Sequence, residues 1–345
     1  MNKLIEFDEK NKVFHLHNDK ISYILSVEEG GYLSHLYFGK KVNGYHGQLR
    51  YPRVDRGFSG NLPESLDRTY SLDSLLQEYS GVGNCDYRTP ALDLQNADGS
   101  FAARLVYQGY EITAGKPKLE GLPAAYANAD EAQTLVLFLK DEVSGVEVTL
   151  LFPIFKDLAI VARSAKVTNA GAEPVELKKV ASMQLDFIKQ DMDVISLPGA
   201  HANERHIQRE AIGQGRKVFE SRRGASSHQM NSFIAVLEHN ADEFSGEVYG
   251  FNLVYSGNHS FEIEKDQFEQ TRVVAGINDY NFSWHLEAGE SFQAPEVLLA
   301  FSANGLNEMS QNYHELIREH IVRGKFKHQE REILVNNWEA TYFEF

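Results

Sequence analysis

Short runs of β-branched and aromatic residues, bounded by Gly, Asn, Asp or Pro, dominate roughly the first 300 residues. Branched and aromatic side chains pack well on a pleated surface, and the bounding residues favour turns. The clearest runs are residues 21–27, 103–108, 134–139, 146–152, 159–164, 175–182, 233–237, 247–255 and 295–301. So many strands without intervening helices predict a mainly β fold, and we expect residues 1–303 to form one large antiparallel sandwich.

The hydrophobic pattern changes near residue 304. Apolar and aromatic positions then recur every three or four residues, namely Leu306, Met309, Tyr313, Leu316, Ile317 and His320. This spacing predicts a helix with one buried face, and Gly324 is a natural stop after it. We therefore expect residues 304–330 to be a linker made of this helix and a loop.

A new apolar stretch follows the predicted linker. Residues 333–338 have a strand pattern, and Trp338, Tyr342, Phe343 and Phe345 fall within eight positions. An exposed aromatic cluster of that size usually marks a missing partner surface, so we expect residues 331–345 to begin a further domain of a longer protein. The alternative is a final strand that packs back on the sandwich.

Charge and composition narrow the possible partners. The formal net charge of the 345 residues is -15, which disfavours nucleic acid and anionic membranes and leaves a neutral partner such as a sugar unaffected. The start of the chain is charged where a signal peptide is apolar, and no apolar run approaches the ~18 residues of a membrane span. The single Cys85 excludes an internal disulfide. These features predict a cytoplasmic protein.

Histidine, serine and glycine clusters give no support for a metal, a cofactor or a nucleophile. His15 and His17 alternate along a strand and share a face, but the sequence places no carboxylate beside them. The run 221–228 contains serines and His228 without the ordering of a catalytic triad. Gly81 and Gly83 lack the strand, loop and lysine of a phosphate site. We predict no metal and no cofactor.

Several stretches carry a resemblance that extends over the chain. They are residues 197–206 (LPGAHANERH), 220–231 (ESRRGASSHQMN), 250–258 (GFNLVYSGN), 271–278 (TRVVAGIN) and 336–343 (NNWEATYF), together with 58–61 and 79–81. In this order they resemble the bacterial, tetrameric α-galactosidases of glycoside hydrolase family 36. The resemblance implies a galactose-mutarotase-like β-supersandwich over residues 1–303, the linker over 304–330, and the first strand of a truncated (β/α)₈ barrel over 331–345.

The same resemblance implies a retaining hydrolase of terminal α-galactosides such as melibiose or raffinose. Two barrel aspartates of that family act as nucleophile and acid/base. Residues 189–193 (KQDMD) only superficially resemble the family's Lys-Trp-Asp-Met-Asn nucleophile tract, since they precede the barrel and lack its Trp and Asn. We therefore expect no catalytic residue in this chain, which would be inactive alone and act in oligomer assembly and in shaping the active site.

Three residues are candidates for substrate binding. Trp338, at the end of the expected barrel strand, would line the galactose pocket by stacking on a sugar ring, although a plain core aromatic is the alternative. Asp55, in the run 51–57, resembles a loop aspartate that reaches a neighbouring subunit of the tetramer; a local pair with Arg53 or Arg56 is as plausible. His201 stands where relatives usually carry Trp near the substrate entrance.

Two other functions stay open on the sequence. A stand-alone carbohydrate-binding module would hold sugar on exposed aromatic residues. A mutarotase-like sugar epimerase would need a histidine and a glutamate that converge on one concave sheet face, which the sequence cannot reveal.

Overall fold

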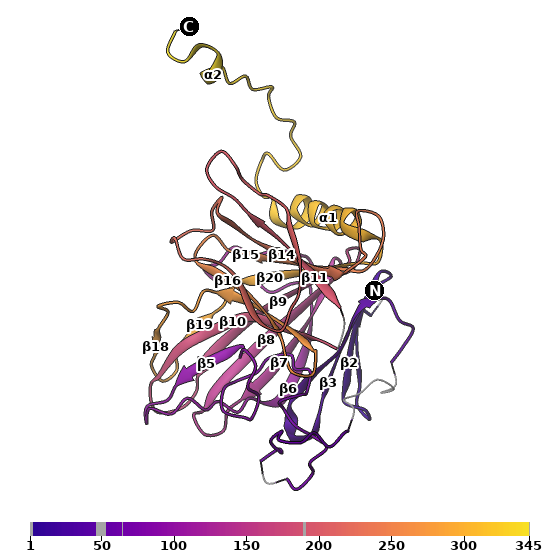
Figure 1. Cartoon of the computed structure of the whole chain (residues 1–345), viewed down its shortest axis with the longest axis vertical. Coiled ribbons are helices and arrows are strands. Elements are labelled where there is room, and N and C mark those ends of the chain that lie inside the picture. The colour runs from indigo at the N-terminus through magenta and orange to yellow at the C-terminus, as the bar shows by residue number, and fades with distance from the viewer. Residues whose placement is uncertain (1–2, 46–52, 64, 189–190, 345) are drawn as a thin grey trace.

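The computed structural model describes residues 3–45, 53–63, 65–188 and 191–344, and most of its regular structure is β (Figure 1). Each of the nine runs predicted as strands overlaps a strand of the structure. The strands of the described residues are arranged in three sheets, in which the paired strands are antiparallel. The prediction of a mainly β, antiparallel fold is therefore confirmed.

The first sheet contains four consecutive strands joined as a meander. They are β1 (Ile5–Asp8), β2 (Val13–His17), β3 (Ile21–Val27) and β4 (Leu33–Lys40). Asn18 fixes the turn between β2 and β3, because its Oδ1 accepts hydrogen bonds from the N–H groups of Lys20 and Ile21 at 2.8 and 2.9 Å. Its side-chain amide also donates to the carbonyls of Phe155 and Leu158, which ties this turn to the rest of the molecule.

Two larger sheets complete the sandwich. The ten-stranded sheet has the order β12 (Gln208–Ala211), β11 (Met192–Pro198), β14 (Met230–Glu238), β15 (Val248–Val254), β20 (Glu296–Ser302), β9 (Ile160–Asn169), β8 (Val146–Phe155), β7 (Ala132–Lys140) and β6 (Val106–Ala114), with β19 (Ser291–Gln293) paired to β9. The six-stranded sheet has the order β13 (Gly215–Ser221), β16 (His259–Lys265), β17 (Thr271–Ile277), β10 (Val175–Phe187) and β18 (Trp284–Leu286), with β5 (Leu92–Gln95) paired to β10.

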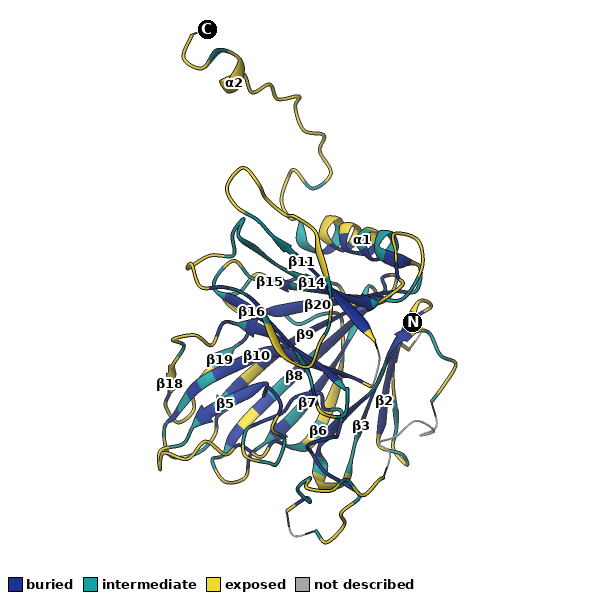
Figure 2. Cartoon of the chain, in the orientation of Figure 1, coloured by how far each residue is buried: buried dark blue, intermediate teal, exposed yellow. Residues whose placement is uncertain are grey.

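Strand β8 illustrates how the sequence places the core. Its alternate residues Val146, Val148, Leu150, Phe152 and Ile154 are at most 1% exposed and belong to the main hydrophobic cluster. The intervening Glu147 and Thr149 are more exposed, as the two-residue period of a strand requires. The main cluster takes side chains from all three sheets, so it is the interior of the sandwich (Figure 2).

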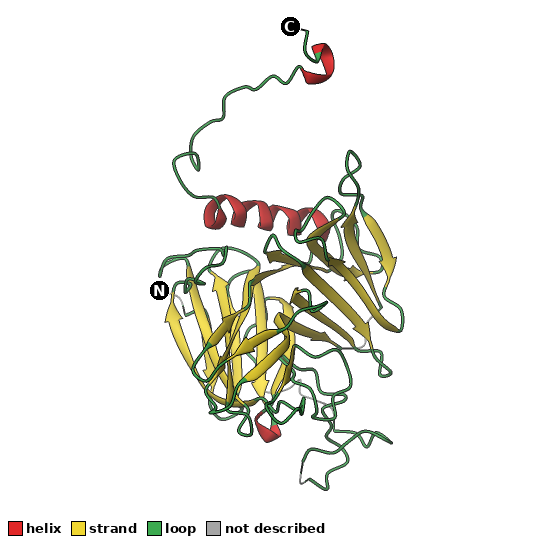
Figure 3. Ribbon diagram, turned by 90° about the vertical axis from the view of Figure 1, so that its left-hand side faces the viewer, coloured by secondary structure: helices red, strands yellow, loops and turns green. Residues whose placement is uncertain are grey.

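The predicted helix is present and covers the other face of the ten-stranded sheet (Figure 3). Helix α1 (Gly305–Leu316) continues into a π-helical turn over Ile317–Ile321. Met309, Tyr313 and Leu316 are buried in a second hydrophobic cluster, and the Tyr313 hydroxyl donates to the Leu298 carbonyl of β20 at 2.9 Å. A β-carbon on Gly250 of β15 would lie only 2.7 Å from the Met309 sulfur, so close packing of the helix requires glycine there.

Residues 331–344, here called the C-terminal segment, differ from the prediction. The expected strand at 333–338 is not formed; α2 (Trp338–Thr341) is a short helix, and the segment extends away from the sandwich (Figure 1). It does not pack back on the sandwich either, because Ile333, Leu334 and Val335 are 82–98% exposed. A strand is stabilised by hydrogen-bonded neighbours, and the described residues provide none for this segment. Its assignment to a barrel stays a prediction.

No helix within the described residues combines the length and the apolar character needed to cross a membrane.

Candidate functional site

Trp338 lies in the C-terminal segment at the start of α2. Its side chain is half exposed and touches only its own segment among the ring contacts of the described residues, with centroids 5.7 Å from Tyr342 and 4.8 Å from Phe343. Trp338 is therefore not a core aromatic of the sandwich. An indole placed this way can present its face to a sugar ring or to another surface.

Asp55 lies in the exposed loop that follows β4. Asp55 forms a local ion pair with Arg68, which lies 3.3 Å from its Oδ1. Arg53, one of the two expected partners, instead pairs with Glu29 and Asp67 at 3.0 and 3.2 Å. Both side chains of the Asp55 pair are more than half exposed, and water screens such a pair strongly. Its neighbours at 51–52 lie outside the described residues.

His201 lies in the tight connection between β11 and β12. Ala200 and Asn203 exchange two backbone hydrogen bonds of 2.9 Å, which close the turn, and Ala202 has a positive φ of 61°. The His201 ring is exposed, and its centroid lies 6.2 Å from that of His228 in an edge-to-face arrangement. Backbone hydrogen bonds, with a smaller contribution from these two rings, lower the pKa of Glu204 below its ordinary value.

The structure does not bring the three predicted residues together. The loop around residues 53–63 lies at the opposite end of the molecule from helix α1 and the C-terminal segment (Figure 1). Asp55 and Trp338 therefore do not form one site within this chain.

The rejected nucleophile-like run at 189–193 lies at the start of β11, and its residues 189–190 are outside the described residues. Asp191 is exposed, as the prediction of a solvated turn requires. Asp193 is buried instead, because Arg209 and His239 bind its two oxygens at 2.7 and 3.0 Å. Burial raises the pKa of Asp193, but these partners outweigh it and hold the pKa below its usual value. Asp193 is thus a structural anion.

A histidine and a glutamate do converge inside the sandwich, as a mutarotase-like site would need. His35 Nδ1 lies 2.7 Å from Glu78 Oε1, and Glu78 Oε2 accepts hydrogen bonds from Tyr23 and Arg163 at 2.7 Å each. Burial raises the pKa of Glu78, yet Arg163 and His35 more than compensate and keep it lowered.

This cluster is closed to solutes. Glu78 is fully buried and His35 is only 5% exposed. The adjacent cavity, lined by Leu33, Gln77 and Tyr79 among others, has a volume of ≈ 10 Å³, which is about one water molecule. The His35–Glu78 pair therefore holds the first sheet against the core, and the geometry gives no support for sugar epimerisation.

An open groove offers a better surface for a ligand. It has a volume of ≈ 510 Å³, within the usual range for small-molecule sites, and is lined by loops near β15, β16, β17 and β18. Tyr280 and Trp284 are about half exposed, and Arg222 stacks on the Tyr280 ring at 4.0 Å. Asn258 and Asn278 add polar groups to this aromatic lining. The sequence did not reveal this groove, because its walls come from separate loops.

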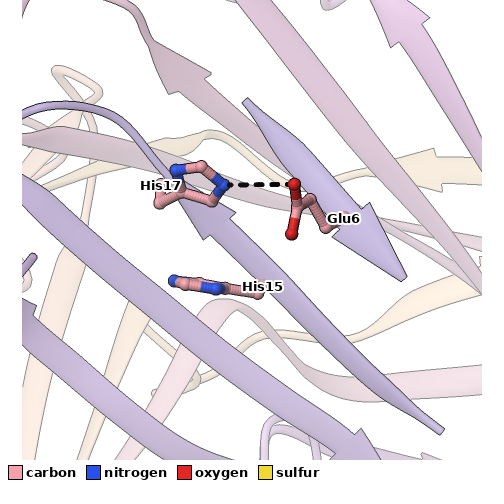
Figure 4. Close-up of side chains that lie close together, drawn as sticks. All are labelled: Glu6, His15 and His17. Atoms are coloured by element: carbon pink, nitrogen blue, oxygen red, sulfur yellow. Dashed lines mark ion pairs between the residues drawn. The ribbon is translucent and has the colours of Figure 1, made fainter. Parts of the chain in front are cut away.

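A second feature missed from the sequence lies on the first sheet. Strand β1 pairs with β2 so that Glu6 is opposite His15, and this register brings a carboxylate to the two histidines (Figure 4). Burial, followed by His17 and Lys41, lowers the pKa of His15 to about 4, so its imidazole is neutral at pH 7. The four-residue β1 carries too little pattern to fix this register in advance.

The chain is similar over almost its whole length to known proteins. Residues 31–287 match the model of the glycosyl hydrolase family 36 N-terminal domain, and residues 291–345 match the model described as melibiase. The chain belongs to glycosyl hydrolase family 36. This family 36 chain is 60% identical over 343 residues to alpha-galactosidase Mel36A of Lactobacillus acidophilus, and 49% identical over 342 residues to alpha-galactosidase AgaA of Geobacillus stearothermophilus. Each alignment covers 99% of the chain but 47% of the relative, so the chain spans about half of their length.

Solved structures of family 36 agree with this assignment. A variant of AgaA from Geobacillus stearothermophilus in complex with raffinose superposes with a TM-score of 0.93 at 50% identity, covering 97% of this chain and 46% of that one. The galactosidase domain of AgaSK gives a TM-score of 0.95 at 44% identity, covering 99% and 47%. The resemblance to family 36 and to its N-terminal portion is confirmed.

Proposed function

We propose that this family 36 chain is the noncatalytic N-terminal portion of a retaining α-galactosidase that hydrolyses terminal α-galactosides such as melibiose or raffinose. The observation that carries the proposal is the match of residues 31–287 to the family's N-terminal domain. The raffinose in the AgaA complex supports the substrate class. Glu78, the glutamate that meets a histidine inside the sandwich, is fully buried and so is not available to a glycoside.

Activity measurements test this proposal directly. The pure 345-residue chain is expected not to hydrolyse p-nitrophenyl α-galactoside, because the two catalytic aspartates of the family belong to the barrel. A version extended by the barrel of Mel36A supplies the positive control and is expected to turn the substrate over. Robust hydrolysis by the chain alone would overturn the noncatalytic assignment.

Trp338 is proposed to line the galactose pocket of the whole protein. Its half-exposed indole and the exposed apolar residues before it support a role on a surface that the sandwich does not supply. In the extended protein we expect Trp338→Ala to lower kcat/KM on raffinose by about tenfold, the equivalent of one aromatic contact. Phe326→Ala, which removes a half-exposed ring outside the C-terminal segment, is the matched control and should leave kcat/KM unchanged.

Asp55 is proposed to complete the active site of a neighbouring subunit in a tetramer. The position of its loop at the opposite end from the C-terminal segment supports an action between subunits over one within a chain. In the extended protein we expect Asp55→Ala to reduce activity on raffinose while light scattering still reports a tetramer. Full activity of that variant tetramer would remove Asp55 from the site.

His201 is proposed to border the substrate entrance, where relatives usually carry Trp. The exposed turn and the neighbouring His228 ring support a contact with the distal part of longer galactosides. In the extended protein, His201→Trp is expected to change the ratio of activity on raffinose to that on melibiose. An unchanged ratio would place His201 outside the entrance.

The groove favours a second function, that of a carbohydrate-binding surface. Half-exposed Trp284 and Tyr280 with nearby asparagines have the composition of a sugar site. Titration of the chain with raffinose, in parallel with its Trp284→Ala variant, separates this from the first proposal. Binding that is lost in the variant supports the groove as a sugar site, and no heat in either rejects it.

A cytoplasmic location is also part of the proposal. Cell fractionation followed by detection with an antibody against the sandwich tests it.

A further inference from the structure

Three side chains with metal-binding groups meet on the outer face of the first sheet. Glu6 and His15 are direct partners in the β1–β2 register, and His17 lies two residues further along β2, hence on the same face. One ligand atom from each of them lies within 4.8 Å of the others (Figure 4). In the part of the chain that the structure describes, no other group of three His, Cys, Asp or Glu residues meets this spacing.

The exposure of the three side chains increases from His15 through His17 to Glu6. His15 is 6% exposed, the His17 side chain 22% and that of Glu6 55%. The open side leaves room for the water molecules that complete the coordination of an ion. His17 Nε2 and Glu6 Oε1 are already 3.9 Å apart, close to the separation of two ligands on one metal ion.

A hydrogen bond to Ser22 also fixes the orientation of the His15 ring. Its Nε2 lies 2.8 Å from Ser22 Oγ, and that oxygen accepts the backbone N–H of Val42 at 3.0 Å. Metal-bound histidines commonly use one ring nitrogen for such a hydrogen bond, which fixes the ring and its tautomer. A ring that is buried and anchored in this way needs little reorganisation to bind an ion.

The charges around the site favour a cation. Lys41 is nearby, but its ammonium pairs with Asp19 at 3.0 Å, so the two charges offset each other. Glu6 then leaves a net negative charge at the site, since the imidazoles are uncharged when they act as ligands.

We propose that Glu6, His15 and His17 bind a zinc ion, with water in the remaining position. Two imidazoles and one carboxylate are a ligand set that suits zinc better than calcium or magnesium, which prefer oxygen ligands alone. The ion ties the short strand β1 to β2 near the start of the chain. It lies on the sandwich and takes no part in the proposed glycoside hydrolysis.

Titration of the tag-free 345-residue chain tests the site. After treatment with EDTA and dialysis at pH 7.5, isothermal titration with ZnCl₂ is expected to show one ion per chain, and Co²⁺ to give a visible d–d absorption band. Glu6→Gln and His17→Gln each remove one ligand from the more accessible part of the site and are expected to weaken Zn²⁺ binding by about tenfold or more. Circular dichroism checks that both variants are folded.

His285→Gln is the matched control. His285 is another strand histidine, flanked by Glu176 and by Glu287 at 3.1 Å, but among the described residues it belongs to no group of three that meets the metal-binding spacing. We expect this variant to bind Zn²⁺ as the parent chain does. Absence of stoichiometric binding, or equal affinities in the parent, Glu6→Gln and His17→Gln chains, would overturn the proposal. Loss of binding in His285→Gln alone would do the same by locating the ion elsewhere.

Discussion

The sandwich and the C-terminal segment use the same kinds of apolar residue with opposite results. Phe152 in β8 is fully buried and stacks beneath the Arg163 guanidinium at 3.9 Å, whereas Phe343 is 80% exposed. Even charged groups are buried in the sandwich, because each finds partners: Arg272 binds Asp186 and Asp86 at 2.8 and 2.9 Å. Partner surfaces decide burial, and hydrophobicity alone does not (Figure 2).

The largest effect is expected when one phenylalanine in each region is replaced by alanine. Phe152→Ala is expected to lower the free energy of unfolding by about 3–5 kcal/mol, since it leaves a cavity in the main core and removes the ring beneath Arg163. Phe343→Ala is expected to change nothing measurable. Urea denaturation of both variants checks this, and equal losses would show that the C-terminal segment is packed in solution.

A smaller effect is expected where the helix meets the sandwich. Gly250→Ala places a methyl group 2.7 Å from the Met309 sulfur and the Tyr313 ring, and such overpacking costs about 1–3 kcal/mol. Gly109→Ala on β6 is the control, because a β-carbon there meets no atom within 4 Å. The two urea midpoints should differ, and matching midpoints would mean that α1 is not held against β15.

Acidification should weaken the sandwich modestly. Burial lowers the pKa of His259 below its ordinary 6.5, so the unfolded chain takes up a proton that the folded chain resists. The contribution of His259 to the free energy of unfolding is therefore complete above about pH 6.5, and it decreases as the pH falls below that value. Comparing urea midpoints at pH 7.5 and 5.5, we expect a smaller change in His259→Phe. An identical change would assign the effect to other groups.

Removal of the C-terminal segment should have no effect on stability. A chain that ends at residue 330 keeps Lys327, whose ammonium binds the Tyr126 hydroxyl at 3.0 Å. Among the described residues that it loses, most are exposed, and Arg331 contacts the neighbouring Phe326. Its melting temperature is expected to equal that of the 345-residue chain. A decrease would reveal contacts between the segment and the sandwich.

The periodic parts of the fold were predictable, because local pattern determines them. Alternation in β8 and the three- and four-residue spacing from Leu306 to His320 identified a strand and a helix that the structure contains. The strand expected at 333–338 is not formed, although its hydrophobic pattern is that of a strand. A strand also needs a neighbouring strand for its hydrogen bonds, and a local pattern does not reveal whether one is available.

Long-range pairings could not be predicted. The sequence gives no sign that Asp55 pairs with Arg68, that Glu6 lies opposite His15, or that Glu78 meets Arg163 across 85 positions. The groove likewise depends on how separate loops converge. The three predicted binding residues came from the family resemblance, and their roles remain predictions that only the whole protein can test.

The buried cluster around Glu78 also joins parts of the chain that are synthesised far apart. Arg163 follows Tyr23 by 140 residues in the sequence and donates a hydrogen bond to its hydroxyl at 2.6 Å. While the ribosome is still producing that stretch, a first sheet that closed early would hold Glu78 without its main counter-charge. The main counter-charge of Glu78 is therefore available only after β9 has been made, so burial of this cluster as the structure shows it requires β9.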